Sequence, residues 1–469
     1  MAQNFVACDR DQVLLLPPDL REWLADGHLA WFVIEAVSEL DLRGFYARYR
    51  DDGTGRAAYD PEMMVALTLY SYAVGVRSSR KIEARCLEDV AFRVICAGAR
   101  PDHATIARFR VDHERALAEL FTQVLALCAE AGMGSVGRVA IDSTKLAANA
   151  SRYQTRGYES IARELLEEAK RIDEREDALY GDQRGDELPP ELRTREGRRR
   201  KLREAKARLD EEKSRRRAAE RARRAERQRR EAEAAERGTR PVGRRPKPAA
   251  ERKKQPSPLR VNLTDPDSKL VKAPHGFIQG YSAQAAVSDD HLIVAAEIAH
   301  EVVDNRQLEP MVRATQRELE AAGIEARPET VLADAGYFNA AQITALEAEG
   351  AELLVATRSD SARKRRAQNR GHLPAPPKPA QGSVRERMAE TLQDEQAKRK
   401  YRRRGALVEP VFGDLTFNRG CDRFSRRGRA AARSEWRLFA ATHNLLRLWR
   451  ESRRPLTSIA TTDPLPMAA

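Results

Sequence analysis

Five apolar runs constrain the fold of this chain more than any other feature of its sequence. They lie at residues 139–142, 276–287, 291–298, 330–334 and 352–357. Apolar runs bounded by turn-forming residues predict buried strands, and the second and third runs predict a hairpin that turns at Asp289–Asp290. Segments of helical periodicity, at 305–322 and 340–349, separate the later runs. The sequence therefore predicts a mixed sheet flanked by helices.

The order of these elements narrows the fold further. Residues 151–260 separate the first predicted strand from the second, and without them the order is β-β-β-α-β-α-β-α. This is the order of the ribonuclease-H-like fold. The predicted fold class is therefore α/β, with a ribonuclease-H-like mixed sheet flanked by helices, an all-α N-terminal domain and an inserted helical hairpin.

The N-terminal 135 residues predict a helical domain, because apolar residues recur there at helical spacing. Two helical segments flank a proline-marked break in a helix–turn–helix-like layout, and Asp102 or Thr105 could cap the second segment. Arg108 and Arg110 on that segment could contact DNA phosphates or base edges. They would equally suit the rim of a helical bundle.

The inserted segment carries most of the positive charge. The chain has 84 Lys and Arg against 71 Asp and Glu, a formal net charge of +13, and residues 195–260 alone hold 27 basic and 11 acidic residues. Apolar spacing predicts two helices in an antiparallel hairpin, followed by a proline-rich return. Arg215, Arg216 and Arg217 follow the end of the apolar stripe, so this arm could contact DNA phosphates. The alternative is a solvated helix face held by Glu–Arg pairs.

Acidic residues end two of the predicted strands. Asp142 ends the first and Asp334 the fourth, and in this fold both carboxylates would leave the same edge of the sheet. Carboxylates this close repel each other, and Mg²⁺, which prefers oxygen ligands, would remove that repulsion. A third acid should come from a late helix, and we choose Glu409, which lies among apolar residues after a basic run. The weaker candidates are Asp414, Glu390 and Glu395.

Other polar residues have structural interpretations. An isolated aspartate at a strand end is usually a turn or helix cap, so only the joint pattern favours a metal site. Asp304 precedes a predicted helix and is expected to be its N-cap. Asp265 and Asp267 are expected in a turn, and His443 is expected to pack within a helix rather than to catalyse.

The sequence also excludes several classes of protein. The longest charge-free apolar run, 63–76, is shorter than the roughly 20 residues of a membrane-spanning helix. No basic stretch followed by an apolar one indicates a secretory signal near the first residue. The five cysteines are scattered without a C-x-x-C pair, which argues against a disulfide framework and a zinc knuckle. We therefore expect a cytoplasmic protein with reduced, mostly buried thiols and no membrane partner.

Several motifs together resemble the DDE transposases of bacterial insertion sequences, in the group with an InsH-type helical N-terminal domain. The motifs, in the family's order, are YDPEMMVALTLYSYAVGVRSSRKIEARC, PDHATIARFR, VAIDSTKLAANAS, LTDPDSKL, GYSAQAAVSDDHLIVAAE, VLADAGYF, VEPVFGDL, RFSRRG and HNLLRLWR. The resemblance implies that Asp142, Asp334 and Glu409 are the catalytic acids and the ligands of two Mg²⁺ ions, which Mn²⁺ could replace. The expected parts are a DNA-binding domain (1–135), a catalytic domain (136–150 and 261–450), the basic insertion (151–260) and a flexible tail (451–469).

Around the third acid, this chain departs from the family's pattern. Related transposases have a Tyr and an Arg at fixed spacing before the Glu, and a Lys or Arg seven residues after it. Here Tyr401 and Arg404 each lie one residue further upstream, and Thr416 stands in place of the base. Arg419 or Arg423 could supply the missing charge to a phosphate, and Arg404 is also a candidate contact to DNA.

Three further residues are candidate contacts to DNA. Lys145 could steady a phosphate, or it could be a surface lysine after a strand. Tyr337 and Phe338, just past Asp334, could stack on an unpaired base, although packing in the interior is equally consistent with the sequence.

The resemblance implies an enzyme that cleaves and joins DNA. Hydrolysis at the end of the element would leave a 3′-hydroxyl, which would then attack target DNA. The implied partners are double-stranded DNA, as terminal inverted repeats and as target, and a second copy of the chain in a homodimer at the bacterial nucleoid. Two alternatives stay open: a ribonuclease-H-like DNA nuclease without strand transfer, and a non-catalytic DNA-binding repressor derived from a transposase.

Overall fold

The structure is a computed structural model that describes seven parts of the chain. These are residues 19–49, 57–150, 155–157, 195–236, 260–273, 276–357 and 381–453. The chain divides into two units, one of residues 1–144, 282–425 and 430–469, and one of residues 145–281 and 426–429. The first unit thus includes both the N-terminal helices and most of the sheet, and the boundary predicted at residue 135 stays a prediction.

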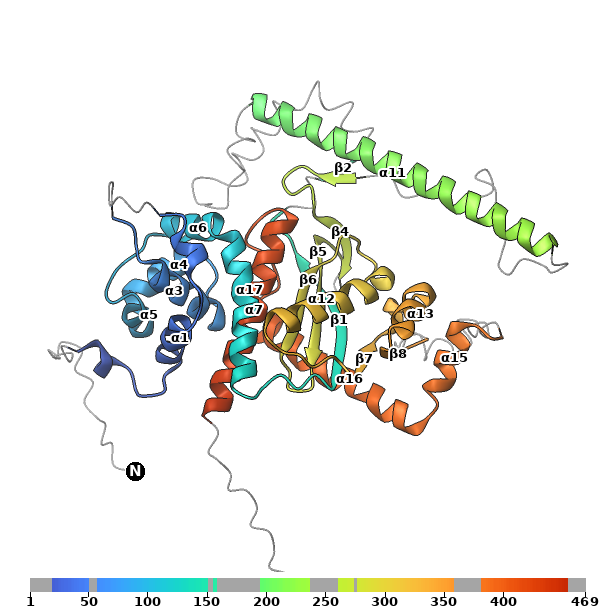
Figure 1. The fold of residues 1–469 in the computed structure, drawn as a ribbon. Helices are drawn as coiled ribbons and strands as arrows, with labels where there is room; N and C mark the ends of the chain where they lie inside the picture. Colours follow the sequence, from blue (N-terminus) through green and yellow to red (C-terminus); the bar gives the residue numbers. More distant parts are fainter. Residues whose placement is uncertain are drawn as a thin grey trace, which may run out of the picture. The chain divides into compact units, whose positions relative to one another are not determined.

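The N-terminal region is helical, as predicted (Figure 1). Its helices are η1 (Leu20–Trp23), α1 (Leu29–Ser38), α2 (Arg43–Tyr46), α3 (Pro61–Ala73), α4 (Ser79–Glu88), α5 (Val90–Ile95), α6 (His103–Asp112) and α7 (Glu114–Glu130). The core helix is α3, which is buried along nearly its whole length. Asp102 caps α6, because its Oδ1 accepts a hydrogen bond of 2.7 Å from the backbone N–H of Thr105.

All five apolar runs form strands of one sheet. Its strands are β1 (Arg138–Ala147), β4 (Lys269–Ala273), β5 (Gly276–Ser288), β6 (Ile293–Ile298), β7 (Thr330–Ala333) and β8 (Glu352–Val355). The order is β4-β5-β1-β7-β8, with β6 also paired to β5. The β5–β6 pair is antiparallel and β1, β7 and β8 are parallel, so the sheet is mixed, as expected.

The register of β1 against β7 positions the two predicted aspartates. Ile141 lies opposite Ala333, and this is the last pair of the parallel ladder. Asp142 is the next residue of β1, and Asp334 is the residue that follows β7. The prediction that Asp142 ends its strand was wrong, because β1 continues to Ala147, but Asp142 is the first residue beyond the pairing with β7.

Helices cover the sheet and connect it to the N-terminal region. They are η5 (Asp304–Arg306), α12 (Leu308–Ala321), η6 (Ala335–Tyr337), α13 (Ala340–Ala348), α15 (Val384–Thr391), α16 (Glu395–Gly413), the π-helical turn η7 (Asp414–Asn418) and α17 (Arg429–Ser452). In Figure 1, α17 runs beside α7. Arg437 of α17 donates to the carbonyl oxygen of Ala118 in α7 and pairs with Glu318 of α12. A C-terminal helix therefore ties the N-terminal helices to a helix of the sheet.

The insertion contains one long helix, α11 (Arg195–Glu236), of 42 residues. At 1.5 Å per residue this helix is about 63 Å long. A short antiparallel pair, β2 (Thr155–Gly157) with β3 (Arg260–Asn262), joins the two flanks of the insertion. The other helix of the predicted hairpin falls outside the described residues. Ala205 and Leu209 are buried, whereas residues 214–222 are all exposed, so the apolar stripe ends where it was predicted to end.

Other expectations concern membranes and cysteines. No helix in the described ranges is long and apolar enough to span a bilayer. Cys86, Cys96, Cys128 and Cys421 are free and buried, and the Sγ atoms of Cys86 and Cys96 are 3.7 Å apart. The remaining cysteine, Cys8, lies outside the described residues.

Candidate active site

Two of the predicted acids, Asp142 and Asp334, lie close enough for the charge of Asp334 to affect the ionisation of Asp142. Burial raises the pKa of Asp142, and the neighbouring charge of Asp334 raises it further. Asp334 Oδ1 accepts a hydrogen bond of 2.8 Å from the backbone N–H of Gly336, so Asp334 also caps η6. The pairing of β1 with β7 thus produces the pair of acids that the sequence predicted.

The Asp142 carboxylate is held on both oxygens. Its Oδ1 accepts a hydrogen bond of 2.7 Å from the backbone N–H of Ser143, and its Oδ2 lies 2.7 Å from Arg404 Nη1. The ion pair is largely sheltered, since the two side chains are 25% and 18% exposed. Burial favours the neutral guanidinium, but the charge of Asp142 prevails and raises the pKa of Arg404. Arg404 is a predicted DNA contact, whereas in the structure its guanidinium contacts Asp142.

A buried polar chain lies next to the two acids. The Tyr337 hydroxyl donates to Gln284 Oε1, and Gln284 Nε2 donates to Asp304 Oδ1 at 2.9 Å. Burial raises the pKa of Tyr337, and the charges of Asp304 and Asp142 add to that effect. Because Tyr337 is fully buried, its ring cannot stack on a base, and we leave it out of the DNA-binding residues proposed below.

The sequence did not predict that Gln284 and Asp304 form hydrogen bonds next to the two acids. Asp304 is not the N-cap of α12, a position that Gln307 takes, so that expectation was wrong. Asp304 instead accepts hydrogen bonds from β5, because Gln284 and Ser282 both point toward it. The available signal was Gln284, one of two glutamines in β5, which lies between two alanines in a buried stretch of the strand.

Glu409 lies on the same helix as Arg404, and its side chain is exposed. Gly405, one turn before Glu409, leaves room for it: a Cβ at Gly405 would be 3.1 Å from Glu409 Oε1. Within the described residues, no three side chains of His, Cys, Asp and Glu gather in a way that could hold a metal ion. The structure therefore brings together Asp142, Asp334 and Arg404, and the role of Glu409 as third acid stays a prediction.

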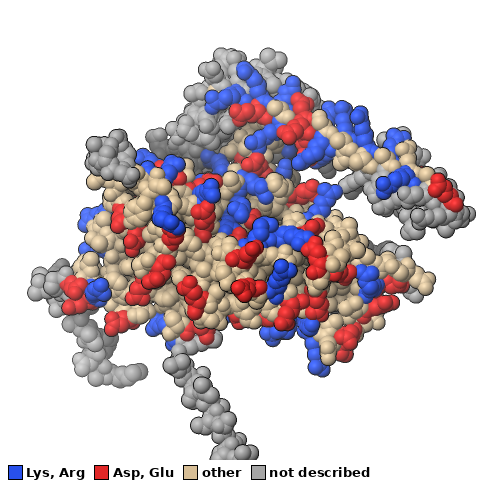
Figure 2. All heavy atoms as spheres, in the orientation of Figure 1, with Lys and Arg blue, Asp and Glu red and all other residues tan. Residues whose placement is uncertain are grey.

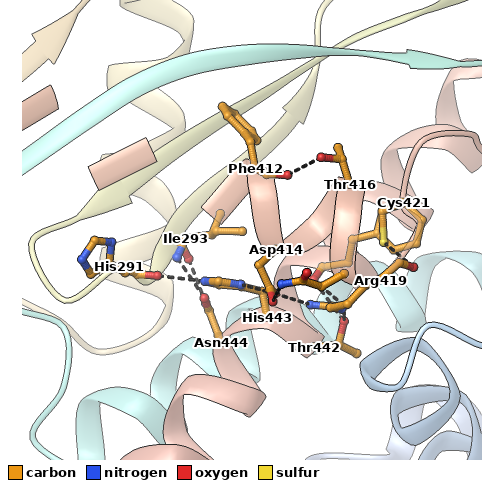
Figure 3. Close-up of polar contacts among 12 residues, drawn as sticks. His291, Ile293, Phe412, Asp414, Thr416, Arg419, Cys421, Thr442, His443 and Asn444 are labelled. Atoms are coloured by element: carbon orange, nitrogen blue, oxygen red, sulfur yellow. Dashed lines mark hydrogen bonds and ion pairs between the residues drawn. The ribbon is translucent and has the colours of Figure 1, made fainter. Parts of the chain in front are cut away.

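The weaker candidates for the third acid have other surroundings. Asp414 lies 3.4 Å from His443 Nδ1, and that hydrogen bond lowers the pKa of Asp414 to about 2 (Figure 3). Burial lowers the pKa of His443, which packs inside the protein and contacts the carbonyl oxygen of His291 through Nε2. Glu395 pairs with Lys398 at the start of α16, and Glu390 is exposed on α15.

Arg419 belongs to the same buried cluster as Asp414 (Figure 3). It is 4% exposed, and its Nη2 donates to the carbonyl oxygens of Tyr72 and Phe439 and to Thr442 Oγ1. Burial lowers its pKa. A guanidinium enclosed in this way has no surface for a phosphate, so Arg419 does not enter the proposal below. Thr416, at the position of the family's base, donates its hydroxyl proton to the carbonyl oxygen of Phe412.

The two arginines of α6 that were predicted to contact DNA differ in their burial. Arg110 is 7% exposed and donates to the carbonyl oxygen of Arg77 at 2.8 Å and to the Tyr72 hydroxyl at 3.2 Å. It stabilises the helical core and does not enter the proposal below. Arg108 is exposed on the same helix.

All but one of the remaining predicted DNA contacts are exposed. Arg215, Arg216 and Arg217 are exposed on α11, where Lys and Arg side chains gather (Figure 2). Arg215 and Arg216 share a single carboxylate, that of Glu212, so only one of their charges is neutralised there. The other two predicted contacts are Arg423, which is exposed, and Lys145, which is half-buried on β1.

Phe338 was the second aromatic residue considered for stacking. The guanidinium of Arg385, from α15, lies over its ring at 3.9 Å from the centroid. One face of Phe338 is therefore covered by a cation of the protein itself.

Two family models match this chain. The model described as "Transposase domain (DUF772)" matches residues 18–112, which include α1 to α6. The model described as "Transposase DDE domain" matches residues 259–445, which include Asp334, Arg404 and Glu409. Asp142 precedes that match, because the insertion separates β1 from the rest of the sheet. Searches of curated proteins and of solved structures find no match.

The two matches together span more than half of the chain, in the order in which the motifs occur. A transposase DDE domain implies a ribonuclease-H-like fold, which agrees with the mixed sheet flanked by helices. It also implies an enzyme that binds and acts on DNA, in a family that typically uses divalent metal ions. The chain belongs to the DDE transposases of insertion sequences.

Proposed function

We propose that this protein binds the ends of an insertion sequence and catalyses metal-dependent cleavage and strand transfer of DNA. One observation carries the proposal: β1 and β7 bring Asp142 and Asp334 together at the end of their paired ladder, beside the residues of the DDE domain. A sheltered pair of carboxylates next to an arginine suits the binding of a cation and of a phosphate.

The residues present fit a divalent metal ion. Burial and Asp334 both raise the pKa of Asp142, so a second ionised carboxylate there is costly unless positive charge is added. Asp142, Asp334 and Glu409 would hold two Mg²⁺ ions, and Mn²⁺ could take the place of Mg²⁺. When bound, the metal would help to activate the attacking oxygen and to stabilise the departing one.

The chain's own groups would position the DNA. Arg108 on α6 would contact the terminal inverted repeats, and Arg423 and Lys145 would contact phosphates nearer the site. Arg215, Arg216 and Arg217 on α11 would contact the backbone without reading its sequence. Water would cleave a phosphodiester at the element's end, and the freed 3′-hydroxyl would attack target DNA, so no covalent intermediate with the enzyme is needed.

The working unit would be a homodimer, because both ends of the element must be processed together. The protein would work in the bacterial cytoplasm, at the nucleoid. The alternatives are a DNA nuclease without strand transfer and a repressor without catalysis.

Replacing either aspartate tests the proposal. Asp142→Asn or Asp334→Asn is expected to abolish Mg²⁺-dependent cleavage of an element end and to leave binding to that end intact. The loss should be at least hundredfold, because each carboxylate contributes to the charge that holds the metal. Glu390→Gln, an exposed carboxylate on α15, is the matched control and should cleave normally.

The products separate the alternatives. Joined donor–target molecules from the wild-type protein would exclude the nuclease, and any cleavage would exclude the repressor. Cleavage at wild-type rate by Asp142→Asn or Asp334→Asn would refute the assignment of the site.

A further inference from the structure

Arg404 is in direct contact with Asp142, one of the candidate metal ligands. Its Nη1 lies 2.7 Å from Asp142 Oδ2. The other oxygen of Asp142 accepts from the backbone N–H of Ser143, in the same strand. Oδ2 is therefore the oxygen whose partner can change without moving the backbone.

The surroundings explain why this carboxylate holds a guanidinium. The Asp142 side chain is only 25% exposed, and Asp334 follows the strand paired with β1, so two acids lie where little water can screen them. Arg404 balances this negative charge, because its Nη1 both pairs with Asp142 and donates a hydrogen bond to it. Its long side chain leaves α16, so it can turn away while the helix stays in place.

A divalent ion held by Asp142 would use the same oxygen and would supply positive charge there in place of the guanidinium. We propose that Arg404 is an internal counter-ion that competes with the metal for Asp142 Oδ2, so that metal binding displaces its guanidinium. This inference rests on the proposed function, which makes Asp142 a metal ligand. Arg404 is then a positioning residue that occupies Asp142 Oδ2 until a metal ion binds, and its removal should strengthen metal binding.

Direct measurement of metal affinity tests the competition. Binding of Mn²⁺ to the full-length protein without DNA would be followed by electron paramagnetic resonance or calorimetry. Arg404→Gln is expected to lower the Kd for Mn²⁺ by about threefold to tenfold, the range for loss of one competing, partly sheltered ion pair. Arg404→Lys keeps a charge and should stay close to wild type.

Arg403→Gln is the matched control. Arg403 is the preceding residue on α16, and it is exposed. The same chemical change at that position should leave the Kd for Mn²⁺ unchanged. An equal or weaker affinity in folded Arg404→Gln would overturn the inference.

Thermal stability provides a second readout if the variant is weakened. With EDTA, Arg404→Gln should melt below wild type, because two carboxylates lose their counter-ion. With saturating Mn²⁺ the difference should shrink, because the metal binds the variant more tightly. The same difference at both metal concentrations would mean a structural role only and would refute the competition.

The result separates this inference from the proposed function. If Asp142→Asn binds Mn²⁺ as well as wild type does, the metal site itself is misassigned. If Asp142→Asn loses binding and Arg404→Gln equals wild type, the metal site stands and only the competition fails.

Discussion

At the scale of residues, two acids five positions apart have opposite surroundings. Glu409 is exposed on α16, whereas Asp414 starts η7 and contacts His443 within a buried cluster. Both were candidates for the third acid, because both follow the same basic run. The sequence could favour Glu409 from the apolar residues around it, but not place Asp414, whose partner lies 29 residues further along.

The two positions should therefore respond differently to loss of charge. Glu409→Gln is expected to reduce cleavage at least hundredfold with little effect on the thermal midpoint, because the side chain is exposed. Asp414→Asn is expected to lower stability and to keep metal-dependent cleavage at temperatures where it is folded. Parallel assays of melting and cleavage check both, and the reverse pattern would move the third acid to Asp414.

At acid pH, the stability of the folded state should depend on the charge of Asp414. Its pKa is lowered from 3.8 to about 2, chiefly by His443, so the folded state favours the carboxylate. A lowered pKa adds stability that is complete above pH 4 and is lost as the pH falls from about 4 to about 2. The full contribution is about 2 kcal/mol. The difference in thermal midpoint between wild type and Asp414→Asn should narrow over this range, and a constant difference would contradict the assignment.

At the scale of elements, strands were predictable where burial is local. β1, β5, β6, β7 and β8 each form from an apolar run that is buried in the sheet. The missed strands are of another kind. β4 has two lysines among its five residues, and β2 and β3 have three residues each and pair across the whole insertion. Strands this short depend on a partner far along the chain, so local sequence carries little signal for them.

The charge of α11 is divided unevenly along its length. Residues 213–230 hold ten Lys and Arg and two Asp and Glu, whereas the other residues of the helix hold eight of each. Arg208, in the balanced part, pairs with Asp267 beside β3. The first half of the helix is thus joined to its own unit through an ion pair, and the excess charge lies beyond it, in residues 213–230.

Neutralising that stretch should flatten the salt dependence of DNA binding. The variant replaces six exposed arginines by glutamine, which keeps helix propensity: Arg215, Arg216, Arg217, Arg221, Arg224 and Arg229. Each lost phosphate contact should reduce the slope of log K against log salt by about 0.9, so six contacts would remove about 5. Glutamine at Arg203 and Lys206, in the balanced part, is the control. An unchanged slope in the sixfold variant would make α11 a solvated helix that does not touch DNA.

At the scale of the whole molecule, the sequence predicts a domain boundary at residue 135, whereas the division of the chain into two units does not fall there. The N-terminal helices share a unit with most of the sheet because α17 packs against both α7 and α12. These contacts join residues more than 100 positions apart, so periodicity near residue 135 could not reveal them. Breaking one ion pair of α17 tests whether the helical region unfolds together with the sheet.

Arg437 and Glu318 form that pair, with side chains 5% and 13% exposed. Burial favours the neutral acid, but hydrogen bonds from Arg437 lower the pKa of Glu318, so removing Arg437 leaves a sheltered charge without its counter-ion. Arg437→Met should cost about 3–5 kcal/mol. Adding Glu318→Gln should recover part of that loss, because no charge then remains buried. Arg433→Met, on the same helix, breaks a more exposed pair with Glu297 and should cost about 1 kcal/mol or less.

The loss of stability should affect the N-terminal helices and the sheet at the same temperature. If α17 makes the N-terminal helices and the sheet a single cooperative structure, Arg437→Met will lose binding to the element's end and cleavage at the same lowered temperature. Binding and cleavage assays after stepwise heating check this. End binding that survives to the wild-type temperature while cleavage fails would show instead that the first 135 residues fold alone, as their sequence predicts.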